Sequence, residues 1–102
     1  MRPTHYMLDG KNAVVEPDLL TWARWFETAH EERIVARTEV GDVMVSTVFL
    51  GLDHCFTPDG PPLIFETLVF GGPHDGEMDR YSTWEEAEQG HAVMLGKLGA
   101  LQ

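Results

Sequence analysis

A two-residue turn signal, Gly41-Asp42, constrains the fold of this chain more than any other feature of its sequence. It separates two stretches rich in β-branched residues, 33–40 and 43–52, and such a turn between such stretches is typical of a tight β-hairpin. A two-residue turn sets Val40 opposite Val43, and this pairing determines which side chains share a face. The sequence therefore predicts an antiparallel hairpin of defined register.

The predicted register divides the hairpin into an apolar face and a mixed face. The apolar face, where we expect the helices to pack, carries Ile34, Ala36, Thr38, Val40, Val43, Val45, Thr47 and Phe49. The mixed face carries Val35, Arg37, Glu39, Met44, Ser46, Val48 and Leu50. Because an antiparallel sheet often exposes one face to water, these charges fit a solvated surface. They also fit a second interpretation, in which the mixed face forms the floor of a polar pocket.

A third strand is predicted over residues 63–71, and it places Glu66 among large apolar neighbours. Glu66 shares its face of this strand with Ile64, Leu68 and Phe70. A carboxylate in such surroundings needs a partner, a shifted pKa or a cavity. If Glu66 and Arg37 share a face of the sheet, an ion pair between them satisfies both. The sequence leaves open whether Glu66 serves such a structural pair or a ligand.

Two helices are predicted from apolar residues at three- and four-residue spacing. The first begins at Pro17, which suits a first helical position, and its apolar stripe runs from Leu19 to Ala29. The second begins after Thr83, which has capping-box spacing to Glu86. Its apolar stripe includes Trp84, Ala87, His91, Met94, Leu95 and Leu98.

The remaining structural signal lies at the start of the chain. Residues 4–8 and 13–16 read as short strands joined by the turn sequence DGKN. Together with the elements above, they predict an α+β fold in a single domain over residues 1–102. Its sheet is a small three-strand antiparallel meander plus the N-terminal hairpin, with two helices packed on it.

The charge balance excludes some classes of partner. The chain has 17 Asp and Glu against 7 Lys and Arg, a formal net charge of -10. Because generic nucleic-acid binding and binding to anionic membranes both depend on basic residues, we expect neither. The single cysteine, Cys55, cannot form an intrachain disulfide, and no apolar run is long enough to span a bilayer. We therefore expect a cytoplasmic protein without an export signal.

The most ligand-like stretch is GGPHDGEMDRYS, residues 71–82, which is predicted to be a turn-rich loop. Arg80 could bind a phosphate or carboxylate, and Tyr81 could stack on a base. We expect both to lie at the end of the sheet that carries the Gly41-Asp42 turn. The predicted ligand-binding residues are Arg37, Glu39, Glu66, Asp75, Arg80, Tyr81 and His91. A secondary patch at the other end consists of Asp53 and His54, with Arg33 and Phe56 nearby.

Metal and nucleophile chemistry have little support in the sequence. The pairs Asp53-His54 and His74-Asp75 follow different strands, so a meander places them at opposite ends of the sheet, roughly 30 Å apart. HExxH, CxxC, nucleophile-elbow and P-loop motifs are missing. We predict no metal, no cofactor and no assigned catalytic residue.

Four blocks of the sequence carry a resemblance to a known group of proteins. They are DLLTWARWFE, ARTEVGDVMVSTVFLGLDH, PPLIFETLVFGG and DGEMDRYSTWEEAEQGH, within about residues 6 to 92. In these blocks the chain resembles small accessory proteins of tailed bacteriophages and prophages. The polar residues that match the pattern are Arg37, Glu39, Ser46, Thr47, Asp53, His54, Glu66, Asp75, Gly76, Arg80, Tyr81, Trp84, Glu86 and His91. The resemblance implies a phage-encoded accessory protein that is made in a bacterial cytoplasm.

These observations predict a small binding protein, without enzymatic activity, that assembles as a homo-oligomer. By analogy with other small phage proteins, it acts on a host protein or sequesters a small anionic ligand, such as a nucleotide-like signal, in counter-defence. One alternative is a small hydrolase that uses Glu66 and His91 as an acid/base pair. Another is a virion or structural accessory protein, or an acidic decoy.

Overall fold

The Gly41-Asp42 turn is formed in the computed structural model, which describes residues 2–55 and 57–99. It joins β3 (Ile34–Val40) to β4 (Val43–Phe49), with Val40 opposite Val43. Gly41 has a φ of 59°, in the left-handed region that glycine enters without steric cost. The predicted hairpin is therefore confirmed, and its register holds from Ala36 to Val40. It shifts by one residue between Ile34 and Ala36, and Val35, predicted on the mixed face, packs against a buried apolar cluster instead.

The main sheet contains one strand more than predicted. Its order is β3-β4-β5-β6, all antiparallel, with β5 at Phe65–Phe70 and β6 at Met78–Tyr81. The prediction of a three-strand meander, with 71–82 as a loop, is wrong in this respect. Strand β6 has four residues inside a turn-rich segment, too few for a periodic pattern. Its pairing with β5 places Arg80 opposite Glu66 and Tyr81 opposite Phe65.

The predicted N-terminal hairpin is present, but it forms a two-stranded sheet of its own rather than part of the main sheet. It consists of β1 (Tyr6–Asp9) and β2 (Asn12–Val15). The Tyr6 N–H donates to the Gly51 carbonyl at 2.8 Å, and His5 forms an isolated bridge with Leu52. These bonds attach the hairpin to the segment that follows β4.

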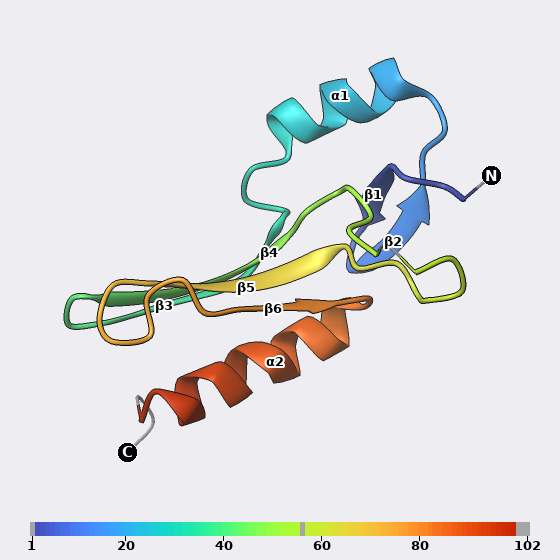
Figure 1. Ribbon diagram of the computed structural model, residues 1–102. Helices are drawn as coiled ribbons and strands as arrows, with labels where there is room; N and C mark the ends of the chain where they lie inside the picture. Colours follow the sequence, from blue (N-terminus) through green and yellow to red (C-terminus); the bar gives the residue numbers. More distant parts are fainter. Residues whose placement is uncertain (1, 56, 100–102) are drawn as a thin grey trace.

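Helix α2 (Trp84–Lys97) covers one face of the main sheet (Figure 1). The Thr83 side chain accepts a bond from the Glu86 N–H, while the Glu86 side chain accepts one from the Thr83 N–H, so the predicted capping box is present. The helix and the sheet share two buried apolar clusters. One consists of Val45, Val69, Met94 and Leu95, and the other of Phe49, Ile64, Phe65 and Ala87. The apolar face predicted from the hairpin register therefore receives α2.

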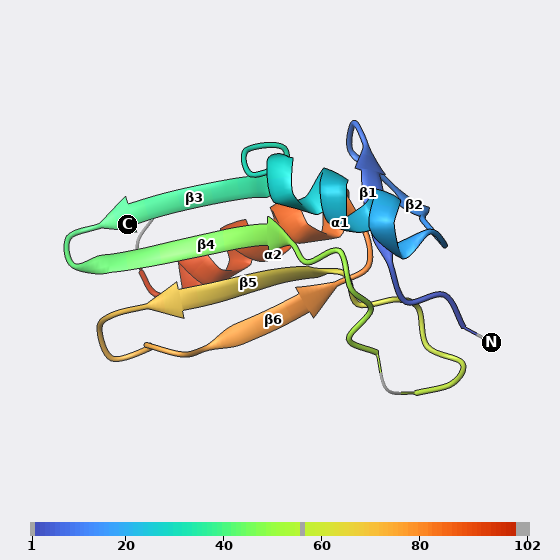
Figure 2. The same cartoon turned by 90° about the horizontal axis from the view of Figure 1, so that it is seen from above.

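Helix α1 (Leu19–Thr28) lies elsewhere, on the opposite side of the sheet from α2 and over the hairpin β1–β2 (Figures 1 and 2). Its cap is Asp18 and its first helical residue is Leu19, two positions later than the predicted start at Pro17. The Trp22 Nε1–H donates to the Tyr6 carbonyl at 2.9 Å. The prediction that both helices pack on the apolar face is thus correct for α2, whereas α1 reaches that face through Trp25, whose ring centroid lies 5.9 Å from that of Phe49.

The start of α1 also departs from its predicted stripe. Leu19 and Leu20 are 59% and 67% exposed, because the hairpin contacts the helix further along its length. In the described part of the chain, neither helix is both long and apolar enough to cross a membrane.

Two glycines of α2 give opposite predictions for the same substitution. A Cβ atom on Gly90 would overlap the ring of Tyr81, whereas one on Gly96 would meet nothing within 4 Å. We expect Gly90→Ala to lower the free energy of unfolding by about 1–3 kcal/mol through overpacking. The matched control, Gly96→Ala, should raise it by up to about 1 kcal/mol through helix propensity. Urea denaturation of both variants measures the difference, and equal effects at the two sites would contradict this packing of α2 on β6.

Candidate functional site

Strand alternation divides the predicted ligand-binding residues between the two faces of the main sheet. The face away from α2, called the open face here, carries Arg37, Glu39, Met44, Ser46, Val48, Glu66, Leu68, Phe70, Met78 and Arg80. Tyr81 and His91 lie instead on the α2 side, and Asp75 lies in the β5–β6 turn. The structure therefore does not bring the seven predicted residues together.

His91 is the centre of a hydrogen-bonded chain that runs beneath α2. Its Nδ1 lies 2.7 Å from Thr47 Oγ1, and its Nε2 lies 2.9 Å from Thr38 Oγ1. Thr47 Oγ1 lies 2.6 Å from Thr67 Oγ1, to which the Tyr81 hydroxyl donates at 3.1 Å. Thr38, Thr47, Thr67 and Tyr81 come from β3, β4, β5 and β6 in turn. This set, called the His91 chain below, ties α2 to every strand of the main sheet.

Each hydroxyl has one proton to donate, which gives the His91 chain a direction. Tyr81 donates to Thr67, and the other partner of the Thr67 hydroxyl among the described side chains is Thr47. Because Thr67 is fully buried, its own proton is satisfied when it donates to Thr47, and the proton of Thr47 then goes to His91 Nδ1. A neutral imidazole with an unprotonated Nδ1 carries its proton on Nε2, which then donates to Thr38. The chain is therefore complete with neutral groups only.

Burial favours this neutral state at both titratable members of the chain. His91 is 5% exposed, and its burial lowers the pKa of the imidazole below the ordinary value of about 6.5. Burial also raises the pKa of the Tyr81 phenol, although the hydrogen bond to Thr67 opposes this. The polar atoms of both side chains therefore serve hydrogen bonds inside the core and not a ligand.

On the open face, Glu66 has a structural partner. Arg80 Nε donates to Glu66 Oε2 at 3.1 Å, and the side chains are 28% and 15% exposed. Glu66 and Arg37 do share a face, the condition set for an ion pair between them, but Arg80 supplies the partner instead. The sequence could not indicate this partner because β6 was not predicted.

Arg80 and Tyr81 were predicted to lie at the Gly41-Asp42 end of the sheet, but the structure places them at the other end. They pair with the start of β5, at the end away from the Gly41-Asp42 turn, because β6 runs back along β5. Arg37 and Arg80 are on strands three positions apart, so about 14 Å separates them across the sheet. The fold therefore does not set the two arginines on neighbouring strands, and Arg80 is already held by Glu66.

Asp75 and the residues of the secondary patch make contacts within the fold and do not converge on a common binding site. Asp75 Oδ1 accepts from the Gly71 N–H at 2.6 Å and closes the β5–β6 turn. Arg33 Nε donates to the Ala29 carbonyl, and its guanidinium stacks 3.8 Å from the Phe26 ring centroid. Phe56 lies outside the described residues, and no side-chain hydrogen bond of His54 occurs among those that are described.

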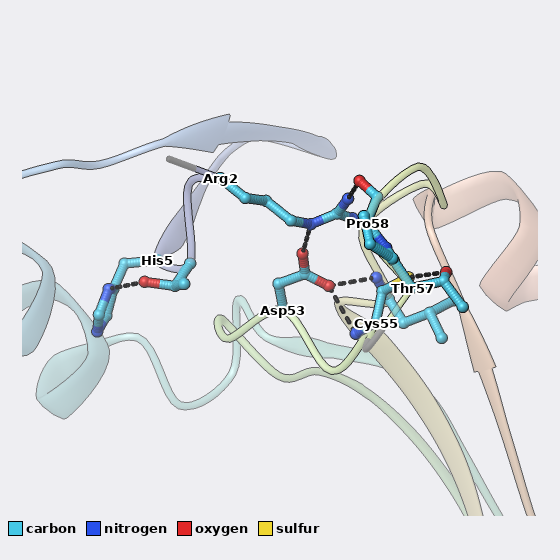
Figure 3. Close-up of polar contacts among 8 residues, drawn as sticks. Arg2, His5, Asp53, Cys55, Thr57 and Pro58 are labelled. Atoms are coloured by element: carbon cyan, nitrogen blue, oxygen red, sulfur yellow. Dashed lines mark hydrogen bonds and ion pairs between the residues drawn. The ribbon is translucent and has the colours of Figure 1, made fainter.

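Asp53 holds the start of the chain against the β4–β5 connection (Figure 3). Its carboxylate accepts from Arg2 Nε at 2.7 Å and from the N–H groups of Cys55 and Leu63 at 2.8 and 3.0 Å. Desolvation raises the pKa of Asp53, but these hydrogen bonds outweigh it, so the pKa lies below its usual range. The Asp53 oxygens are therefore occupied by internal donors.

The geometry bears on two chemical alternatives, an acid/base pair of Glu66 and His91 and a metal site. Glu66 and the His91 chain lie on opposite faces, since Glu66 and Thr67 are consecutive residues of β5 and Thr67 belongs to the chain. The proposed Glu66–His91 acid/base pair is therefore wrong. Among the described residues, no group of three or more His, Cys, Asp or Glu side chains could hold a metal ion.

A hollow of about 260 Å³ lies at the Gly41-Asp42 end of the sheet, on the α2 side. Val43, Val45, Leu95 and Leu98 contribute apolar walls, and His74 is the titratable residue that lines it. None of the predicted ligand-binding residues lines this hollow. The predicted polar site and this hollow thus do not coincide.

Comparison with known proteins does not assign a function. The chain significantly matches no protein-family model, no curated protein and no solved structure. The open face and the His91 chain must therefore be interpreted from their own geometry.

The prediction from sequence missed the threonines of the His91 chain. Thr38 and Thr47 lie on the face that was predicted to be apolar, and His91 on the apolar stripe of α2. Since a buried polar group needs a partner, threonines on one side of this interface and a histidine on the other are the signal that could have revealed the chain.

Acid should destabilise the protein through His91. Because its pKa is lowered by folding, the unfolded chain binds the proton more readily below about pH 6.5. The free energy of unfolding should thus be level above that pH and fall as the pH decreases further. Denaturant titrations from about pH 7.5 to about pH 5 measure this slope.

His91→Gln removes the titrating group and should flatten the slope, while lowering stability at neutral pH by about 1–3 kcal/mol through lost hydrogen bonds. His30→Gln, in an exposed loop, is the control and should keep the parent slope. An unchanged slope in His91→Gln would show that another group causes the acid sensitivity.

Proposed function

We propose that this chain is a non-enzymatic binding module that engages a host protein through the open face of its main sheet. The observation that carries the proposal is the exposure of large apolar side chains on that face. Phe70 is 44% exposed and Met78 is 48% exposed. Their partners on the neighbouring strands, Met44 and Leu68, are half-buried on the same face. Figure 1 shows that neither helix covers this face over the half next to the Gly41-Asp42 turn.

The arrangement of charges around these apolar residues supports a protein partner. Arg37 and Glu39 border them along β3, and the Glu66–Arg80 pair borders them at the other end. An apolar centre with a polar rim is the usual anatomy of a protein–protein interface. An exposed sheet face also suits a protein surface better than a small molecule, which usually occupies a concave site.

The net charge of -10 indicates the kind of partner. An acidic protein attracts a basic surface over long range and speeds its association. We therefore propose a basic host protein as the partner. The resemblance to small phage proteins suggests that the encounter takes place in a bacterial cytoplasm and acts in counter-defence.

The sequestering of a nucleotide-like ligand has less support. The two arginines proposed to bind its phosphates lie about 14 Å apart across the sheet, and Arg80 already pairs with Glu66. Tyr81, proposed to stack on a base, donates its hydroxyl into the core.

Immobilised protein can test the open face against a bacterial lysate. Phe70→Asp places a charge in the apolar centre, whereas Val93→Asp places one on the outer side of α2, where Val93 is 70% exposed. We expect the parent and Val93→Asp to retain the same basic protein and Phe70→Asp to lose at least about tenfold of it. Equal retention by Phe70→Asp, or retention of a nucleotide instead of a protein, would contradict the proposal.

A further inference from the structure

Among the residues that the structure describes, the outer edge of β3 is the longest strand edge of the main sheet without a pairing partner. β3 has seven residues, whereas β6, at the other edge, has four. Natural sheets protect their edges with short strands, proline, lysine or bulges. The register shift of β3 lies at its start, between Ile34 and Ala36, and residues 36–40 contain no proline and no lysine. This edge is therefore open to pairing (Figure 2).

The hydrogen bonds of β4 determine which backbone groups of β3 point outward. The Phe49 N–H donates toward β3, to the Arg33 carbonyl, and the Leu50 N–H donates toward β5, to the Ile64 carbonyl. Odd-numbered residues of β4 therefore face β3, and their partners in β3 are the even-numbered residues from Ala36 to Val40. The outward N–H and C=O groups consequently belong to Arg37 and Glu39.

We infer that a second copy of this chain adds to this edge, with β3 antiparallel to β3 of the partner copy. Only registers that place odd-numbered residues opposite one another join the outward groups. A two-fold axis at Thr38 sets Arg37 of each copy opposite Glu39 of the other. Both residues are exposed and lie on the open face, so two reciprocal ion pairs form beside the backbone bonds.

Like-charge repulsion excludes the neighbouring registers. An axis at residue 37 sets Arg37 opposite its own copy, and an axis at residue 39 does the same for Glu39. The register centred on Thr38 also sets Ala36 opposite Val40, and Val40 is 45% exposed in the single chain. Charge and apolar burial therefore favour the same pairing.

The dimer does not depend on the proposed function. It joins two main sheets edge to edge into one continuous sheet, so the open faces of both copies remain accessible on the same side. Loss of host-protein binding in Phe70→Asp would leave the dimer intact, because Phe70 lies on β5.

Charge reversal tests the inferred register directly. In sedimentation velocity over a wide concentration range, Arg37→Glu alone and Glu39→Arg alone should each weaken dimerisation about tenfold by placing like charges opposite one another. The double variant Arg37→Glu/Glu39→Arg should restore it. Arg24→Glu, on the exposed surface of α1, is the control and should dimerise like the parent.

Amide exchange supplies a second readout that does not require a variant. The N–H groups of Arg37 and Glu39 should become protected as the parent concentration rises. A monomer at every concentration, a dimer insensitive to both single reversals, or a double variant that stays monomeric would each overturn the inference.

Discussion

The His91 chain is the interaction on which this fold depends. One imidazole on α2 reaches hydroxyl groups of β3 and β4, and the chain continues through β5 to the Tyr81 phenol of β6. Thr47 and Thr67 are fully buried, so no water can replace a lost partner there without a rearrangement of the core. This polar chain therefore specifies where α2 lies on the sheet, which apolar packing alone would leave less defined.

Because α2 covers one face of the main sheet, the open face is the part of the sheet that can contact a partner. Tyr81 contributes its hydroxyl to the His91 chain, while Arg80, one residue earlier, contributes its charge to the open face. Strand β6 thus completes the core on one side and neutralises Glu66 on the other. The exposed apolar residues between Arg37 and Arg80 then remain without a partner inside the described chain.

The sequence predicted those parts of the fold that local patterns determine. The Gly41-Asp42 turn indicated the β3–β4 register, and Thr83 with Glu86 indicated the start of α2. Strand β6 was missed because four residues among turn signals carry no periodicity, and with it the partner of Glu66 was missed. The predicted site combined residues of both faces, because the β5–β6 pairing that separates Arg80 from Tyr81 is a long-range property.

The tautomer of His91 tests this account most directly. Proton donation from Tyr81 through the threonines requires an unprotonated Nδ1 and a proton on Nε2. Nitrogen-15 NMR of the imidazole ring at neutral pH distinguishes the two tautomers and the cation. We predict the neutral Nε2–H form with its proton protected from exchange, and an Nδ1–H form or an imidazolium would contradict the direction of the chain.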